Sequence, residues 1–236
     1  MTLTLTNLTK QYGSFTALQN FNYEFTAGVY GLLGPNGAGK STLMNIITDN
    51  LKATSGLVRF DGEDITKMDA DFRKILGFMP QQQGIYPNFT LERFLYYMAA
   101  LKGMKKADAK PQIEKLLNLV NLQDSKNKRL GGFSGGMKQR ALIAQAMLGE
   151  PKVIILDEPT AGLDPKERIR IRNLVAQIAF DKIVIIATHV VSDIEFIAKE
   201  VLLMKRGEII DSGAPHILCE KIDGKVLSLI HISEPT

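Results

Sequence analysis

The most constraining feature of this chain is the nine-residue stretch Gly34–Thr42, which reads GPNGAGKST. It fits the pattern G-x-x-x-x-G-K-[ST], in which glycines let the backbone turn tightly, so that successive N–H groups point at one phosphate chain. Lys40 is then placed to reach the outer phosphates, and the hydroxyl of Ser41 is placed to hold Mg²⁺. The pattern therefore predicts a loop that cradles the phosphates of a nucleotide.

The residues on either side supply the context that this loop needs. Val29–Leu33 is an apolar run that predicts a buried strand, and Leu43, Met44, Ile46 and Ile47 give one apolar face of a helix. A helix N-terminus carries about half a positive charge, which favours a phosphate group there. The alternative is a glycine-rich turn with a chance lysine, and the order strand, loop, helix argues against it.

Composition limits the class of protein. A chain of 236 residues, with 45% hydrophobic and 23% charged residues, is typical of one large α/β domain with a sizeable core. Cys219 is the only cysteine, which excludes an internal disulfide and fits a reducing compartment. We see no signal-peptide pattern and no apolar run near the roughly 18 residues of a membrane span, so we expect any membrane role to come through a partner.

Alternating strand and helix signals predict an α/β fold with a mainly parallel sheet. Leu3–Leu8 and Phe21–Phe25 alternate between apolar and polar residues, so we expect these early strands to form an antiparallel edge. Residues 84–149 have a different character and are expected to form a helical subdomain inserted into the α/β frame. The other expected elements are buried strands at Ile75–Met79, Val153–Leu156 and Ile183–Ala187, helices at Leu91–Leu101, Gly135–Leu148 and Ile194–Ala198, and a hairpin around Arg206.

Two adjacent acidic residues follow one of these buried strands. Val153–Leu156 delivers Asp157 and Glu158 at its carboxyl end, where ligands bind in open α/β sheets. Asp157 is placed to hold Mg²⁺ directly or through water, and Glu158 is placed to deprotonate a water that attacks the γ-phosphate. An acidic turn that merely caps the strand is the alternative, which a phosphate loop in the same chain weakens.

A second helix N-terminus is predicted at Phe133–Arg140, where Ser134, Gly135 and Gly136 open a helix. A hydroxyl and two glycines at such a terminus are able to receive an anion. One nucleotide does not need two such termini from one fold, so we expect the second to serve the nucleotide of another chain. A plain helix capped by Ser134 is the alternative reading.

Together these stretches resemble the ATP-binding subunit of an ABC transporter, and the resemblance covers nearly the whole chain. Gly34–Thr42 matches the Walker A loop, Val153–Glu158 the Walker B strand, and Phe133–Arg140 the ABC signature. Lesser matches follow in the expected order: Tyr12 at the aromatic residue that stacks on adenine, Gln81 at the Q-loop, Thr160–Asp164 at the D-loop and His189 at the switch histidine. The resemblance implies a P-loop NTPase core, with residues 1–226 as a single ABC ATPase domain.

The family's mechanism implies a role for each matching residue. ATP would contact Tyr12 and the loop residues Gly34, Pro35, Asn36, Gly37, Ala38, Gly39, Lys40, Ser41 and Thr42. Mg²⁺ would be held by Ser41, Gln81 and Asp157, and catalysis would rest on Glu158, His189 and Gln81. The signature residues Ser134, Gly135, Gly136 and Met137 would meet the ATP bound by a second subunit, and Asp164 would couple the two sites. ATP would close the dimer and hydrolysis would reopen it, driving a membrane permease from the cytoplasmic face of the cell membrane.

The signature departs from the family's usual LSGGQ at two positions, with Phe133 for Leu and Met137 for Gln. Met137 lies beyond the serine and glycines that touch phosphate, so it casts little doubt on activity. The SGGM signature and the segment Gly84–Thr90 resemble the drug and peptide exporter branch, so we expect an exporter.

Three other classes of function are weighed against this reading. A soluble ABC ATPase acting on DNA or ribosomes would carry a long coiled-coil insertion or two cassettes, and we expect no nucleic acid partner here. The signature argues against an unrelated P-loop kinase or GTPase. A nucleotide-binding scaffold without turnover would lack Glu158 or His189, and both are present.

The sequence of the last ten residues, Leu227–Thr236, is not what we expect at the C-terminus of this fold. They resemble the translation of a transposase adapter used to prepare sequencing libraries. We therefore expect a non-native tail there and exclude these residues from fold reasoning.

Overall fold

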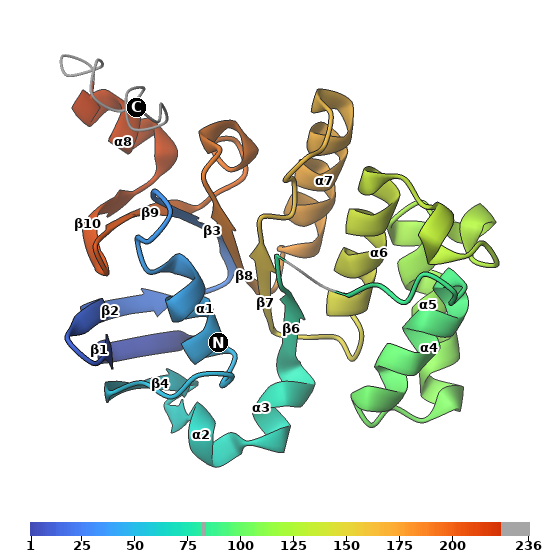
Figure 1. Ribbon diagram of the computed structural model, residues 1–236, viewed down its shortest axis with the longest axis horizontal. Helices are drawn as coiled ribbons and strands as arrows, with labels where there is room; N and C mark the ends of the chain where they lie inside the picture. The colour runs from blue at the N-terminus through green and yellow to red at the C-terminus, as the bar shows by residue number, and fades with distance from the viewer. Residues whose placement is uncertain (82–83, 223–236) are drawn as a thin grey trace.

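A six-stranded sheet forms the centre of the computed structural model, which describes residues 1–81 and 84–222 (Figure 1). The strand order is β10-β9-β3-β8-β7-β6, and every neighbouring pair is parallel except β10 with β9. The parallel strands confirm the expected architecture. Their bounds are Gly28–Leu33 (β3), Leu76–Met79 (β6), Val153–Asp157 (β7), Ile183–Thr188 (β8) and Glu200–Lys205 (β9), with the antiparallel Glu208–Gly213 (β10) at the edge.

The early strands lie in a second, antiparallel sheet with the order β2-β1-β4-β5. The antiparallel strands expected from the sequence are therefore present, but in a sheet of their own, because β1 is paired on both sides, with β2 and with β4. Their bounds are Leu3–Tyr12 (β1), Phe15–Phe25 (β2), Ser55–Phe60 (β4) and Glu63–Asp64 (β5). The antiparallel edge of the central sheet is β10, from the hairpin around Arg206.

Two hydrophobic cores lie on the two faces of the central sheet. The strand β7 shows the division, because Val153 and Ile155 pack with α1 (Lys40–Ile47) and the second sheet, whereas Ile154 and Leu156 pack with α7 (Pro165–Ile178). A parallel strand covered on both faces reads as a continuous apolar run, which is the pattern of this segment. The phosphate loop thus stands between two well-packed layers.

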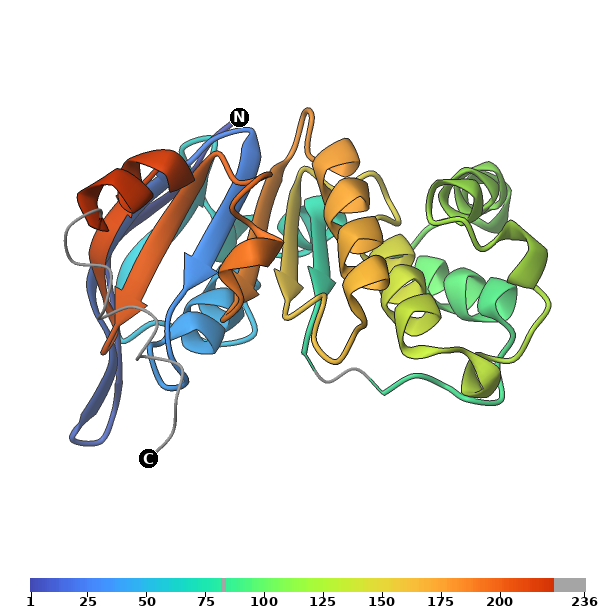
Figure 2. The same cartoon turned by 90° about the horizontal axis from the view of Figure 1, so that it is seen from above.

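The helices α4 (Leu91–Leu101), α5 (Lys106–Leu119) and α6 (Gly135–Ala146) form a block at the end of the molecule opposite the β1–β2 hairpin, as both views show (Figure 1, Figure 2). This helical block falls within the expected residues 84–149, and α6 ends two residues earlier than predicted. The shorter helices are α2 (Ile65–Met68), α3 (Ala70–Ile75), η1 (Gln123–Ser125), η2 (Leu130–Gly132) and α8 (Pro215–Ile222). Among the described residues, no helix has both the length and the apolar character needed to cross a membrane.

The helix expected at Ile194–Ala198 is wrong. The structure has a 3-10 helix, η3 (Val191–Asp193), followed by a single turn in which Ala198 N–H donates to Ile194 O at 2.8 Å. The next N–H, that of Lys199, donates to Val29 O of β3 at 2.7 Å. The backbone is therefore drawn into sheet pairing after one turn, and the helix cannot continue. The tail expected at Leu227–Thr236 lies outside the described residues.

Candidate active site

The predicted phosphate loop joins β3 to α1, as the sequence indicates. The helix begins at Lys40, and its N-cap is Gly39, whose φ of 103° is a conformation that favours glycine. A Cβ atom at Gly39 would also lie 2.6 Å from Ala17 O of β2, so a side chain cannot fit there. The loop is thus held tightly between its own helix and the second sheet.

The ammonium group of Lys40 hydrogen-bonds to the backbone of this loop. Its side chain is buried, and Nζ donates to Gly34 O at 2.5 Å and to Pro35 O at 3.1 Å. Burial lowers the pKa of Lys40, and the carboxylates of Glu158 and Asp157 oppose that shift. The charge therefore sits at the position where outer phosphates would replace the two carbonyls as partners.

The three strands that follow β3 in the sheet order bring Gln81, Asp157, Glu158 and His189 to the same edge of the sheet as the loop. The register pairs Leu33 with Thr188, Ala187 with Asp157, and Leu156 with Met79. The phosphate loop follows β3, His189 follows β8, and Gln81 comes two residues after β6. Because β8 lies between β3 and β7, His189 stands between the loop and the acidic pair.

Glu158 is held in an unusual backbone conformation. Its φ is 49°, in the left-handed region that residues with a side chain rarely adopt, and its N–H donates to Ala187 O at 2.9 Å. Such a conformation costs roughly 1–3 kcal/mol and is concentrated at functional sites. The buried carboxylate accepts a hydrogen bond from His189 Nδ1 at 2.8 Å, while the histidine itself is 62% exposed. Among the described residues, no hydrogen bond involves the second nitrogen of this ring.

The charge of Asp157 is electrostatically unfavourable. Burial, and after it the neighbouring Glu158 carboxylate, raise the pKa of Asp157 to about 6, although Lys40 and a backbone hydrogen bond from Gln81 act in the opposite direction. The structure therefore brings Lys40, Gln81, Asp157, Glu158 and His189 into one cluster. An electrostatically costly carboxylate of this kind, next to a phosphate loop, is suited to receive a cation.

The signature residues lie on the helical block and form no hydrogen bond with Lys40 within residues 1–81 and 84–222. Ser134 caps α6, its hydroxyl accepting from Met137 N–H at 3.3 Å. Ser134 and Gly135 are exposed and Gly136 is buried, whereas the Met137 side chain packs against the core. An open helix N-terminus is therefore available to an anion that this chain's own loop does not hold.

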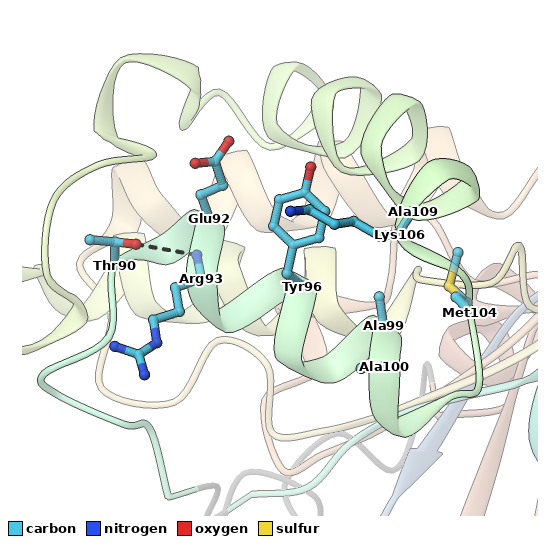
Figure 3. A pocket seen from close by; sticks show the side chains of 9 residues that line it. All are labelled: Thr90, Glu92, Arg93, Tyr96, Ala99, Ala100, Met104, Lys106 and Ala109. Carbon is cyan, nitrogen blue, oxygen red and sulfur yellow. Dashed lines mark hydrogen bonds between the residues drawn. The ribbon is translucent and has the colours of Figure 1, made fainter.

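The remaining predicted residues are also outside the cluster. Tyr12 is 49% exposed at the end of β1, with Lys10 Nζ 5.0 Å from its ring centroid. Asp164 caps α7, its carboxylate accepting from Glu167 N–H at 2.9 Å. A pocket of about 500 Å³ lies on the helical block, lined by α4 and the start of α5, and no residue of the phosphate loop lines it (Figure 3).

The contacts of three residues near the motifs are not predicted by the sequence. Asp193 is buried and accepts a hydrogen bond from the hydroxyl of Thr160, which ties the loop after His189 to the start of the predicted D-loop. Arg140 lies 3.5 Å from a Glu167 carboxylate oxygen. Glu167 is the third residue after the cap Asp164, a position typical of a capping box, and nothing in the sequence indicates its pairing with Arg140.

Asp157→Asn is expected to stabilise the nucleotide-free protein at neutral and higher pH. The pKa of Asp157 is raised from 3.8 to about 6, so the folded state holds this proton more tightly than the unfolded chain. The charged carboxylate therefore opposes folding above pH 6, and the cost fades as the pH falls toward 3.8. Its upper limit is about 3 kcal/mol, and partial exposure to solvent reduces it to about 1 kcal/mol.

Urea unfolding at about pH 8 and about pH 5, on either side of the raised pKa, measures this effect. The Asn variant should gain stability at the higher pH and gain less at the lower pH. Asp211→Asn is the matched control, because hydrogen bonding to Lys221 lowers the pKa of Asp211, so no gain is expected there. An equal gain at both pH values for Asp157→Asn would contradict the assignment.

Comparison with known proteins identifies the family. A family profile described as "ABC transporter" matches residues 18–161. The "Uncharacterized ABC transporter ATP-binding protein YxlF" of Bacillus subtilis (strain 168) is 36% identical over 228 residues, which cover 96% of this chain and 76% of that protein. The "Nod factor export ATP-binding protein I" of Burkholderia orbicola (strain AU 1054) is 33% identical over 219 residues, covering 91% of this chain and 71% of that protein.

Solved structures agree with the sequence relatives. The cbiO1 protein of Clostridium perfringens, described as part of the ABC transporter complex cbiONQ, has a TM-score of 0.84 at 30% identity and covers 98% of this chain and 96% of that one. The ATP-binding cassette MJ0796, a dimer in a post-hydrolysis state bound to ADP and Pi, has a TM-score of 0.79 at 27% identity and covers 90% and 98%. The chain belongs to the ABC transporter family, as an ATP-binding subunit that hydrolyses ATP.

Proposed function

We propose that this subunit binds ATP with Mg²⁺ in the phosphate loop, pairs with a second ATP-binding subunit and powers a separately encoded membrane permease that exports its cargo. One observation carries the proposal. Lys40, Asp157, Glu158 and His189 converge at one edge of the sheet, whereas the open N-terminus at Ser134 lies apart from them on the helical block. Each subunit thus holds most of one nucleotide site and a separate anion-binding terminus.

In the hydrolysis step, the Glu158 carboxylate is the general base. It takes a proton from the attacking water while the bond between the γ-phosphorus and the bridging oxygen breaks and ADP leaves with the electron pair. The constrained backbone of Glu158 and its contact with His189 support this role, because both fix the carboxylate before the nucleotide arrives. Lys40 stabilises the charge on the outer phosphates, and His189 uses its second ring nitrogen toward the γ-phosphate.

The donor set fits Mg²⁺. Mg²⁺ binds through one or two protein oxygens plus substrate phosphates rather than in an all-protein cage. The Asp157 carboxylate, the Ser41 hydroxyl and the Gln81 amide oxygen are hard oxygen donors, and the described residues contain no cluster of three or more His, Cys, Asp or Glu side chains that would form such a cage. When bound, the metal supplies charge neutralisation to the phosphates, and Asp157 is relieved of its unfavourable charge.

The shared-site proposal concerns the signature. Ser134, Gly135 and Gly136 of one subunit would contact the γ-phosphate held by Lys40 of the other, with Met137 behind them in the core and Asp164 at the junction of the two sites. Dimeric MJ0796 bound to ADP and Pi supports such a pairing for a structurally similar cassette. Tyr12 would stack on adenine, for which its exposed ring is available.

The partner proposal rests on the relatives. An export ATP-binding protein and a member of a transporter complex are among the similar proteins, which supports a permease partner and an exporter. The subunit would then sit at the cytoplasmic face of the membrane through that permease. We further propose that residues 1–226 form one ATPase domain, with residues 84–149 as its helical subdomain.

Glu158→Gln is expected to keep ATP binding and to abolish turnover, with kcat falling by about 10²–10⁴ because the general base is lost. ATP should then trap the dimer, which light scattering would detect. Glu150→Gln is a matched control: Glu150 shares the left-handed backbone, with φ 52°, but is exposed before the opposite end of β7. Hydrolysis at the wild-type rate in Glu158→Gln would refute the base assignment.

Ser134→Arg is expected to prevent ATP-dependent dimerisation while the isolated monomer binds ATP normally, because a bulky cation would occupy the place of the partner's phosphate. Thr90→Arg is the matched control, since Thr90 also caps a helix of the same block, accepting from Arg93 N–H at 3.2 Å. Both changes remove a cap worth about 1 kcal/mol, so only the Ser134 variant should lose dimerisation. Loss of ATP binding by the monomer would contradict the shared site.

The reading frame beside the gene tests the transport proposal. It is expected to encode a permease with about six spanning segments of about 20 apolar residues each. ATPase activity should rise when the two proteins are reconstituted together in vesicles. A neighbour without spanning segments, combined with stimulation by DNA or ribosomes, would instead favour the soluble ABC ATPase class.

A further inference from the structure

We propose that Glu167 is a positioning residue: its carboxylate, on the first turn of α7, sets the orientation of the signature helix α6 through Arg140 and Gly136 of the same chain. This inference rests on the proposed function, because it assumes that the N-terminus of α6 meets a partner's nucleotide. Figures 1 and 2 show α6 and α7 side by side. The two helices therefore have the contact that the inference requires.

The first observation is a buried ion pair between these helices. Arg140 Nε lies 3.5 Å from Glu167 Oε2, and the two side chains are only 11% and 15% exposed. This oxygen accepts no hydrogen bond from any residue in the part of the chain that the structure describes. The other oxygen, Oε1, pairs with Arg170 of the same helix, so Arg140 is the cation that ties this carboxylate to α6.

The second observation concerns the second glycine of the signature. A Cβ atom at Gly136 would overlap the Glu167 carboxylate, with its carbon Cδ only 2.7 Å away, whereas a Cβ at Gly135 would meet Leu163 Cδ2 at an ordinary 3.4 Å. Gly136 is also buried, unlike Ser134 and Gly135. Glycine at position 136 therefore makes room for a carboxylate of its own chain, in addition to any contact that its N–H makes with a partner's phosphate.

The third observation is the reach of Arg140. Besides Glu167, its guanidinium donates to Val120 O at 3.0 Å and to Asn121 O at 3.1 Å, at the end of α5. It thus joins α5, α6 and the first turn of α7. That turn also carries Arg168, which lies 3.9 Å from the carboxylate of Asp193 in the segment after His189. The first turn of α7, which follows Asp164, therefore contacts both α6 and the segment after His189.

The consequence is a selective effect on turnover. Without the Glu167 carboxylate, α6 loses its charged tie to α7, and the Ser134 terminus no longer meets the partner's nucleotide at a fixed angle. ATP binding within one chain is untouched, because Glu167 forms no hydrogen bond or ion pair with the phosphate loop among the described residues. If Glu167 has this role, its loss should lower kcat without changing the ATP affinity of the monomer.

A double-mutant cycle between Gly136→Ala and Glu167→Ala tests the inference. Each change alone should lower kcat about tenfold, since the methyl group added by the first displaces the carboxylate and the second deletes it. Combined, they should cost no more than Glu167→Ala alone, because no carboxylate is left for the new methyl group to displace. Gly135→Ala is the control, and its effect should multiply with that of Glu167→Ala, since its Cβ atom does not approach Glu167.

Multiplying losses for Gly136→Ala and Glu167→Ala would overturn the inference and leave Gly136 as a phosphate contact only. Thermal melting identifies any variant that fails to fold, and Glu167→Gln, which keeps the size of the side chain, then provides the decisive measurement: an unchanged kcat overturns the inference. Ser134→Arg in the same assay keeps the two proposals apart. If it leaves turnover unchanged, the shared site is wrong; if it abolishes turnover while Glu167 variants are normal, only the role of Glu167 is wrong.

Discussion

The site depends on holding two adjacent carboxylates and one ammonium at a single edge of a parallel sheet. Asp157 and Glu158 repel each other, burial penalises the charge of Asp157, and Lys40 compensates only in part. Such an arrangement persists only where the surrounding structure fixes each group. The strand order β3-β8-β7 does this, because it sets the loop after β3 and the acidic end of β7 on either side of the histidine that follows β8.

The rest of the fold follows from keeping those strands rigid. β7 and β8 are buried on both faces, so they need a layer on each side. The helix α1 and the antiparallel sheet cover one face, and α7 covers the other. The helix α1 begins within the site, at Lys40, whereas α7 begins directly after Asp164, outside the cluster. One of the helices that stabilise the sheet therefore also supplies a residue of the site.

Much of this could be predicted from local sequence. The strand, glycine loop and helix around Lys40, the strand that ends in Asp157, and the cap at Ser134 all have short-range patterns with a physical cause. The early strands were harder, because alternation indicates a half-buried strand but not which sheet it joins. The turn at Ile194–Ala198 was also missed, since the competing partner of Lys199 N–H is Val29, which lies far away along the chain. Long-range pairing of this kind leaves no periodic trace.

The signature also contains a residue whose surroundings local sequence does not indicate. The proposed function explains its serine and glycines by a phosphate group that approaches from outside, and Ser134 and Gly135 are exposed, as that proposal requires. Gly136 faces inward, where the carboxylate of Glu167, from the next helix along the chain, occupies the space a side chain would need. Under the two proposals, neighbouring residues of one helix turn meet different requirements, one set by the nucleotide of a partner subunit and one by the helix α7. A substitution at Gly136 that impairs turnover is therefore not, by itself, a measure of phosphate contact.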